Sequence, residues 1–315
     1  CISFAFYGVK NGLFGFIRGN PIIRGPGGLL GDNNDFALAL VMGLPFMHYL
    51  GIGATNPRVK TAMKAAFFLT IWTIILTHSR GGALAMGVTV MAIAWRSRVR
   101  MLAFAGLAVG GLIFLVIMPD SYKERMGTLK KGVQADSSAQ ARIKSWGIAM
   151  QMIRSFPAFG VGFNQFQPNY VKFDPRTVKQ YKYGKTWVAH NSYLQIWSES
   201  GSIAFAVYLA LFASTFFLLA RVRREAASRY FTSWISNYAC MFEASLVGFM
   251  VGGMFLNRGH FDLVYHIMGM SVVFARIARA EMRSPVLHPE RGVRGARVLV
   301  KRDFERKPLP GFRTA

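Results

Sequence analysis

Seven apolar stretches of roughly membrane-spanning length constrain the fold of this chain more than any other feature. A helix needs about 20 mostly apolar residues to cross the hydrocarbon core of a bilayer. In lipid the backbone must satisfy its own hydrogen bonds, so spans of this kind are helices. The sequence therefore predicts an all-α fold, a polytopic integral membrane helical bundle. The stretches cover residues 36–55, 62–78, 81–95, 101–118, 202–220, 235–256 and 261–278.

The composition excludes an ordinary soluble domain. Charged residues make up 17% of the chain and hydrophobic residues 52%, whereas a soluble domain is about 25% charged. The net charge of +24 comes largely from Arg and Lys clusters that separate the apolar stretches. The two cysteines, Cys1 and Cys240, are too few for a disulfide framework or a cysteine-based metal site.

The positions of the basic residues predict how the spans are oriented. Short cytoplasmic loops carry an excess of Lys and Arg, and here every second connection is basic, after the first, third, fifth and seventh stretches. We therefore expect a multi-pass protein of the bacterial inner membrane. Its other connections, 1–35, 79–80, 119–201 and 257–260, would face the periplasm.

This topology divides the chain into five parts, of which the large outward segment is expected to carry the chemistry. The chain opens with an apolar segment, Cys1–Tyr7, that is typical of the end of a span. The parts are the end of a truncated span with a periplasmic loop (1–35), four transmembrane helices (36–118), a large helical periplasmic loop with the catalytic site (119–201), three transmembrane helices (202–278) and a basic cytoplasmic tail (279–315).

Charge outside the spans points to anionic partners. The segment 119–201 contains 12 Lys or Arg and five Asp or Glu, which makes either a solvated surface or an electropositive face that gathers an anionic substrate. Charge alone does not distinguish the two. The tail is rich in Arg, Pro and Gly, which predicts disorder. Its charge suits contact with anionic membrane lipids better than with nucleic acid.

Arg142 is the first candidate residue for substrate binding. Ser137 and Gln140 form a capping box that predicts a helix start, and Pro157 ends the run. Arg142 would lie in the first turn, where the positive end of the helix dipole disfavours a cation. A bound anion would offset that cost. The alternative is an ordinary surface arginine.

His190 is the candidate catalytic base. It lies at the predicted start of a second helix, with Asn191 as a plausible N-cap. The helix dipole disfavours the charged imidazolium there, and the neutral imidazole is the form that accepts a proton from an attacking hydroxyl. The alternative is a histidine packed at an interface. Nothing between the two helices is typical of a dinucleotide site.

Arg80 is the third candidate, in the short turn Thr77–Gly82 between two spans. A charge at the membrane boundary is expensive enough to suggest a function, although an arginine can also extend to the lipid headgroups. Glu243 lies within a predicted span and could pair with an arginine whose position the sequence does not indicate.

Five short motifs, in this order and within this topology, resemble the O-antigen ligase and polymerase superfamily. The first, together with Phe6–Lys10, is similar to one branch, the exosortase A-associated O-glycosylation ligases. The motifs are Asp-Asn-Asn-Asp-Phe-Ala-Leu-Ala-Leu (32–40), Ser-Arg-Gly-Gly (79–82), Ala-Arg-x-x-x-Trp (141–146), Phe-Pro-x-x-Gly-x-Gly (156–162) and His-Asn-Ser-Tyr-Leu (190–194).

The resemblance implies a glycosyltransferase that uses an undecaprenyl-diphosphate-linked glycan, without a cofactor, a nucleotide sugar or a metal ion. It implies that Arg80 and Arg142 bind the diphosphate and that His190 acts as the base, with Asn191 as a further candidate for substrate binding. The acceptor would be a hydroxyl of a lipid or a protein, and direct in-line attack would invert the anomeric centre.

Two other functions stay open at this level. A polymerase that joins lipid-linked repeat units would share the chemistry and differ only in its acceptor. A polysaccharide transporter or flippase would show internal repeats, interrupted spans and charged pairs at mid-membrane. The chain shows no internal repeat, although Pro45 and His48 within the first span are compatible with this third function.

Overall fold

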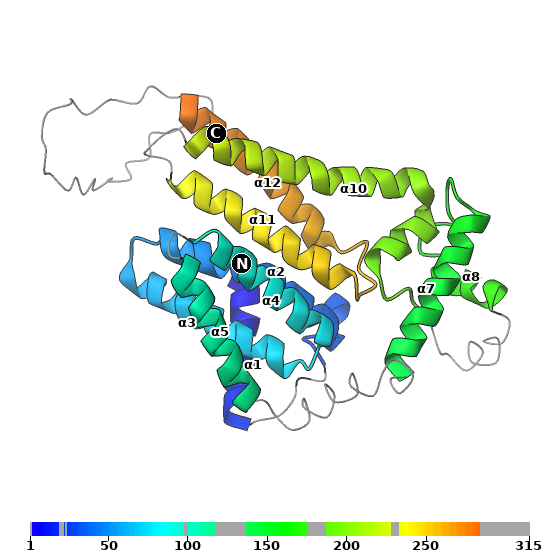
Figure 1. Ribbon diagram of the computed structural model, residues 1–315, viewed down its shortest axis with the longest axis horizontal. Coiled ribbons are helices and arrows are strands. Elements are labelled where there is room, and N and C mark those ends of the chain that lie inside the picture. The colour runs from blue at the N-terminus through cyan, green and yellow to red at the C-terminus, as the bar shows by residue number, and fades with distance from the viewer. Residues whose placement is uncertain are drawn as a thin grey trace, which may run out of the picture. The chain divides into compact units, whose positions relative to one another are not determined.

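Ten α-helices make up the part of the chain that the computed structural model describes, residues 2–18, 22, 24–97, 100–117, 137–174, 187–227 and 233–283. Among these residues the only extended pairing is an isolated bridge between Arg24 and Asp32. The helices are α1 (Ile2–Arg18), α2 (Asn33–Gly53), α3 (Pro57–Leu76), α4 (Arg80–Trp95), α5 (Arg100–Ile117), α7 (Ser137–Ser155), α8 (Phe166–Phe173), α10 (Ser192–Ala227), α11 (Ser233–Gly253) and α12 (Asp262–Arg283), with a short 3-10 helix, η1 (Gly28–Leu30) (Figure 1).

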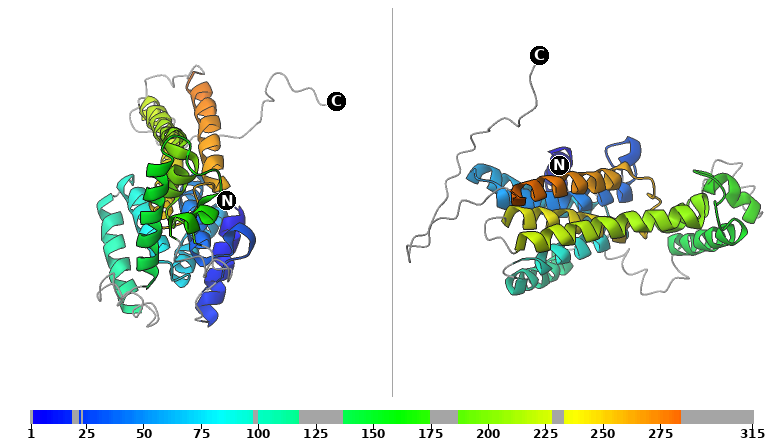
Figure 2. Two further views of the ribbon diagram at one scale, coloured as in Figure 1. Left: turned by 90° about the vertical axis from the view of Figure 1, so that its right-hand side faces the viewer. Right: turned by 90° about the horizontal axis from the view of Figure 1, so that it is seen from above.

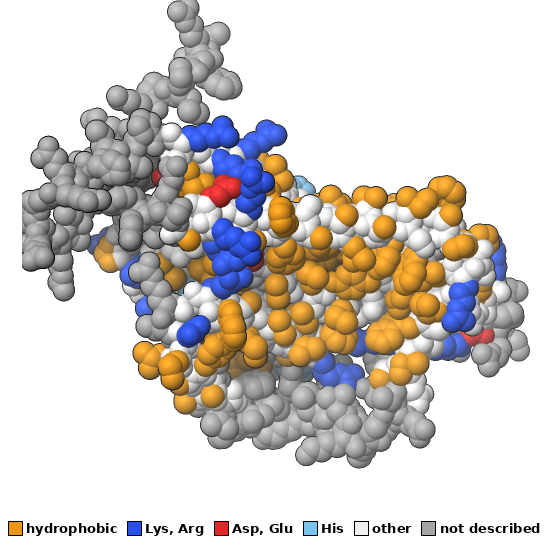
Figure 3. Space-filling view, turned by 45° about the horizontal axis from the view of Figure 1, so that its top comes forward, with side chains coloured by type: hydrophobic (Ala, Val, Ile, Leu, Met, Phe, Trp, Pro, Cys, Tyr) orange, Lys and Arg blue, Asp and Glu red, His pale blue; other side chains and the backbone are white. Residues whose placement is uncertain are grey.

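The predicted fold class, an all-α polytopic membrane protein, is confirmed. Four of the described helices are long and apolar enough to cross a membrane, α2, α3, α10 and α12, and α4 is apolar but shorter. Large apolar side chains such as Phe68, Phe217 and Val273 are exposed. Figure 3 shows such side chains over one face of the helices, with Arg and Lys gathered toward one end. Lipid, rather than water, suits a surface of this kind.

Helix α2 forms the centre of the bundle because it is apolar on nearly every side and its neighbours have small residues at the points of contact. It packs against α3, α4 and α11. A Cβ atom added to Gly82 of α4 would lie 2.7 Å from Ala37, and one added to Gly248 would lie 2.9 Å from Val41. The Ser245 hydroxyl also donates to the carbonyl of Met42 at 2.7 Å. Small residues and interhelical hydrogen bonds are the usual means of helix association in membranes.

The first helix differs from the prediction for residues 1–35. We expected the apolar segment to end near Tyr7, but α1 continues to Arg18. The physical reason is close packing against α3: a Cβ at Gly8 would lie 2.1 Å from Thr70 Oγ1. The Thr73 hydroxyl donates to the Gly8 carbonyl at 2.6 Å. The helix is therefore stabilised by α3 beyond the run of large apolar residues.

Glu243 of α11 has two arginine partners. Its Oε2 atom lies 3.0 Å from Nη2 of Arg96, just after α4, and its Oε1 atom lies 3.4 Å from Nε of Arg223 in α10. The pairing that the sequence suggested therefore exists, and it joins three helices at one end of the bundle. Figure 2 shows α10 running alongside α11.

The described part of the large connecting segment is helical, as expected, with one helix more than the sequence indicated. Helix α7 covers the predicted helix 137–156, whereas α8 was not predicted. Residues from α7, α8 and the start of α10 share a small apolar core that holds the segment together: Ile148, Ala149, Met152, Phe166, Tyr170 and Ala189. Figure 1 shows α7 and α8 beside the kinked end of α10.

Two further expectations concern segment boundaries. The tail was expected from residue 279, but α12 continues to Arg283, because Arg279 lies 3.4 Å from Glu225 and the Trp234 indole donates to Glu281 at 3.1 Å. The rest of the predicted tail, 284–315, lies outside the described residues. So do 118–136 and 175–186 of the large connecting segment.

Candidate active site

Four helices begin close together at one end of the bundle, and three predicted site residues lie at this end. The Asn33 side chain, at the start of α2, donates to the Thr77 carbonyl before α4 at 2.7 Å. The Ser192 hydroxyl, at the start of α10, donates to Leu256 O at 2.8 Å and accepts from Arg258 N at 3.0 Å, in the connection to α12. Helix N-termini carry partial positive charge and attract anions.

Arg80 is the first residue of α4 rather than part of an isolated turn. Ser79 caps the helix, since its hydroxyl accepts from Gly82 N at 3.0 Å. The next residue, Gly81, packs so closely on the α11–α12 connection that an added Cβ would lie 3.0 Å from Phe255. These contacts hold Arg80, which is half-buried, at the end of the bundle where the four helices start.

His190 precedes α10 in a left-handed backbone conformation, with φ of 50°. Such a conformation costs about 1–3 kcal/mol for a residue other than glycine and is frequent at functional sites. Asn191 is the N-cap, as the sequence predicted, because its Oδ1 accepts from Tyr193 N at 2.9 Å and Leu194 N at 3.1 Å. The Asn191 oxygen is thus engaged in the cap, which leaves its amide Nδ2 as the atom to consider for substrate binding.

The His190 imidazole is held in its neutral form. Burial of the ring lowers its pKa below the ordinary value, and the nearby positive charge of Arg142 lowers it further, while Asp32 acts in the opposite direction. We expected the helix dipole to cause this shift; burial is the main cause instead. A neutral imidazole can accept a proton near neutral pH.

Arg142 and His190 are brought together although 48 positions separate them in the sequence. Arg142 is half-buried in the first turns of α7, and α7 packs against α10. The charge of Arg142 acts on the His190 ring. Arg142 is therefore half-buried and close enough to His190 to affect its charge, unlike a fully exposed surface arginine.

The connection between α11 and α12 adds an arginine that the sequence did not single out. Arg258 forms an ion pair with Asp35, in the first turn of α2. Asp35 and Asp32 belong to the Asp-Asn-Asn-Asp motif, and Asp32 caps α2 by accepting from Asn34 N at 2.8 Å. Arg258 lies in a short connection predicted to face outward, where positive charge is scarce. The same signal identified Arg80 and would have identified Arg258.

His260, from the same connection, pairs with Glu199 of α10. The His260 Nε2 and Glu199 Oε2 atoms lie 3.2 Å apart, and Glu199 Oε1 accepts from Phe166 N at 3.2 Å. The Glu199 side chain is only 2% exposed, so both of its oxygens are used within the protein. This pair was also missed in the sequence.

The Phe-Pro-x-x-Gly-x-Gly motif has a structural role at the kink of α10. The backbone leaves the helical conformation at Gly201, with φ of 78°. An added Cβ at Gly160 would lie 2.5 Å from the Glu199 carbonyl, and Gly160 itself has a positive φ of 69°. The Val161 and Gly162 amides each donate at 2.9 Å to the carbonyls of Ser198 and Glu199. The motif thus stabilises the kink of α10 through these backbone hydrogen bonds.

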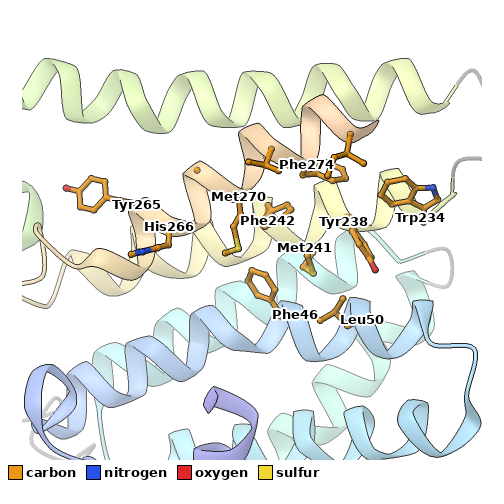
Figure 4. A pocket seen from close by; sticks show the side chains of 13 residues that line it. Phe46, Leu50, Trp234, Tyr238, Met241, Phe242, Tyr265, His266, Met270 and Phe274 are labelled. Carbon is orange, nitrogen blue, oxygen red and sulfur yellow. The ribbon is translucent and has the colours of Figure 1, made fainter. Parts of the chain in front are cut away.

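An apolar groove of about 820 Å³ lies between α2, α11 and α12 (Figure 4). It starts at Tyr265 and His266, in the first turn of α12. The Tyr265 hydroxyl donates at 2.7 Å to the carbonyl of Gly259, next to Arg258. The groove therefore begins beside the site and continues along the apolar part of the bundle. Its other lining residues are Phe46, Leu50, Trp234, Tyr238, Met241, Phe242, Gly269, Met270, Val273, Phe274 and Ile277.

Within the described ranges, no three or more His, Cys, Asp or Glu side chains gather in a way that could hold a metal ion. Cys240 is buried and free. Two carboxylates at this end of the bundle, Asp35 and Glu199, are instead paired with Arg258 and His260.

One comparison with known proteins finds a family model that matches the central part of the chain. Residues 65–209 match the family model described as O-antigen ligase. The matched range contains Arg80, Arg142, His190 and Asn191, whereas Asp35, Arg258 and His260 lie outside it. None of the curated proteins compared with the chain matches it.

Proposed function

Because residues 65–209 match the family model described as O-antigen ligase, which suggests a membrane glycan ligase or polymerase, we propose that this chain transfers a glycan from an undecaprenyl-diphosphate carrier to an acceptor hydroxyl. The acceptor belongs to a lipid or a protein. The observation that carries this proposal is that a half-buried neutral histidine and several arginines lie at the end of the bundle where four helices begin.

The diphosphate of the donor would bind to the arginines at this end of the bundle. Arg80 and Arg142 come from the matched domain, and Arg258 lies beside Ser192. An arginine guanidinium can hold phosphate oxygens through two parallel hydrogen bonds, and the helix starts add partial positive charge. The same groups would stabilise the negative charge that develops on the diphosphate as it leaves.

The carrier lipid would lie in the apolar groove between α2, α11 and α12. From Tyr265 to Ile277 the groove follows α12 for about 18 Å, at 1.5 Å per residue. Its start near Gly259 suits a ligand whose charged head binds at Arg258 and whose polyprenyl chain extends into the membrane. Hydrophobic and aromatic linings of this volume are typical of sites for apolar ligands.

His190 would act as the general base. The acceptor oxygen forms a bond to the anomeric carbon as the bond from that carbon to the diphosphate oxygen breaks. His190 takes the hydroxyl proton, and the electron pair of the broken bond leaves with the diphosphate. Attack opposite the leaving group inverts the anomeric centre. A good leaving group held by arginines makes a divalent metal ion unnecessary.

We place the reaction on the periplasmic face of the bacterial inner membrane. The alternation of basic short connections supports this orientation. A polymerase would use the same site with a second lipid-linked glycan as acceptor, so the geometry supports a ligase and a polymerase equally. The product of the reaction distinguishes these two functions.

The experiment is transfer by the purified full-length protein in lipid nanodiscs, supplied with an undecaprenyl-diphosphate glycan from the host strain. Mass spectrometry of the products separates acceptor-linked glycan from lengthened lipid-linked glycan. Arg80→Lys should retain partial activity and Arg80→Ala almost none, because lysine keeps the charge but loses the paired hydrogen bonds. Arg58→Ala is the control, because Arg58 lies in the first turn of α3, at the end of that helix far from Arg80. Absence of both products with wild-type protein would reject the function.

A further inference from the structure

An exposed aromatic ring lies against the second histidine of the site. The ring centroids of Phe163 and His260 are 4.4 Å apart. Phe163 is 68% exposed, whereas the His260 side chain is 30% exposed. A large apolar side chain that remains exposed beside a polar group is a common feature of binding sites. This pair lies outside the membrane-spanning helices.

The His260 ring is fixed by a buried carboxylate. Glu199 binds His260 Nε2 at 3.2 Å and is itself anchored by the Phe166 amide. The neighbouring backbone is anchored too, because Gly259 N donates to Gln195 Oε1 at 3.0 Å. With Nε2 engaged by Glu199, the Nδ1 edge of the ring is the one that a ligand can approach.

Phe163 is equally well positioned. Its loop is held on α10 by the Val161 and Gly162 amides. Gly162 has φ of 110°, a conformation that favours glycine. A side chain presented by a fixed backbone loses little entropy on binding a ligand. The two rings therefore form a surface that exists before any ligand arrives.

The surface adjoins the proposed diphosphate site. His260 is two residues from Arg258, so their Cα atoms are at most about 7 Å apart. Both belong to the connection that lies along the first two turns of α10. A group bound at Phe163 and His260 would thus lie next to the diphosphate bound at Arg258, or be covalently attached to it.

We propose that Phe163 and His260 form a subsite for one sugar ring of the glycan substrate, with Glu199 as the residue that positions His260. A sugar ring has an apolar C–H face, which packs on an aromatic ring, and hydroxyl groups, which bond to the imidazole edge. This inference rests on the proposed function. The subsite adds contacts that would determine specificity for the sugar. Phe163 lies within residues 65–209, which match the family model, and His260 lies outside them.

The test compares Phe163→Ala with Phe159→Ala, a neighbour in the same loop that is 79% exposed. Loss of an aromatic contact of about 0.5–1.5 kcal/mol corresponds to a change of roughly 2- to 10-fold. We expect Phe163→Ala to raise the KM for the glycan by this factor with kcat nearly unchanged, and Phe163→Tyr to restore it. Varying the donor and acceptor separately shows which sugar occupies the subsite.

The subsite is rejected if Phe163→Ala has the KM of the wild type, or if Phe159→Ala raises the KM equally, as a general surface effect would. A wild-type protein without any transfer activity would reject the proposed function instead. In that case saturation-transfer NMR with the glycan released from its carrier decides on the subsite. A signal lost in Phe163→Ala but kept in Phe159→Ala supports it, and equal signals contradict it.

Discussion

Arg258, in the connection between α11 and α12, forms an ion pair with Asp35, which lies 223 positions earlier in the first turn of α2. The pair joins the start of α2 to the α11–α12 connection at the candidate active site. It also fixes the guanidinium that we expect to share the diphosphate with Arg80 and Arg142.

Replacing Arg258 with Ala should lower both stability and activity. The largely buried Asp35 carboxylate would lose its partner, at a cost of about 1–3 kcal/mol. Thermal unfolding in detergent and single-turnover transfer measure the two effects. Arg258→Lys should recover most of the stability but less of the activity. A variant Arg258→Ala with wild-type melting temperature and turnover would show that the pair has neither role.

The acid limb of the pH profile should report His190. Its pKa is lowered from the ordinary value near 6.5, so the neutral, active form persists below that pH. We expect kcat/KM to stay constant as the pH falls through 6.5 and to decrease only at lower pH. The stability that the neutral ring contributes changes with pH in the same direction. It is present above the pKa of the unfolded state and is lost as the pH falls through the lower pKa of the folded state.

Removing the charge of Arg142 should shift the acid limb of the pH profile to higher pH. Arg142→Gln removes one of the two causes that lower the His190 pKa, so the decrease should begin at higher pH. Arg154→Gln, an exposed arginine in the last turn of α7, is the matched control and should leave the limb in place. Equal pH profiles of kcat/KM for both variants would show that Arg142 does not influence the pKa of His190.

Several parts of this protein could be predicted from local signals in the sequence. Runs of apolar residues predicted the long apolar helices, a capping box predicted α7, and Asn191 was recognised as an N-cap. Each of these features is determined by neighbouring residues. The left-handed conformation of His190 and the burial that lowers its pKa depend on packing and could not be predicted this way.

Long-range pairs were the part that the sequence could not provide. Glu243 was recognised as a buried charge, but its partners Arg96 and Arg223 depend on how α4 and α10 cross α11. The pairs Arg258–Asp35 and His260–Glu199 depend in the same way on the path of a short connection. Helix α1 is longer than expected because Gly8 and Thr70 pack closely, which no property of residues 1–18 alone indicates.

Chelation of divalent metal ions should not affect transfer. The mechanism assigns stabilisation of the leaving diphosphate to arginines, so a metal ion has no step to perform. Transfer by purified protein with and without EDTA tests this directly. Loss of activity that Mg²⁺ or Mn²⁺ restores would contradict the mechanism.

Single cysteines should report the orientation of the chain in intact spheroplasts. We expect Gln140→Cys, at an exposed position of α7, to react with a membrane-impermeant thiol reagent, and Thr55→Cys, between α2 and α3, to be protected. The parent protein gives the background from its own cysteines, of which Cys240 is buried. Labelling at residue 55 but not at 140 would reverse the predicted topology.

Single-turnover transfer by His190→Ala tests the central claim most directly. Loss of a general base costs about 10²–10⁴-fold in rate, and this variant should show that loss while remaining folded in the membrane. The control is His48→Ala, another partly buried histidine, located in α2 about 22 Å along the helix from its start at 1.5 Å per residue. With turnover normalised to folded protein, His48→Ala should transfer normally. Near-normal turnover in His190→Ala would contradict the assignment of His190 as the base.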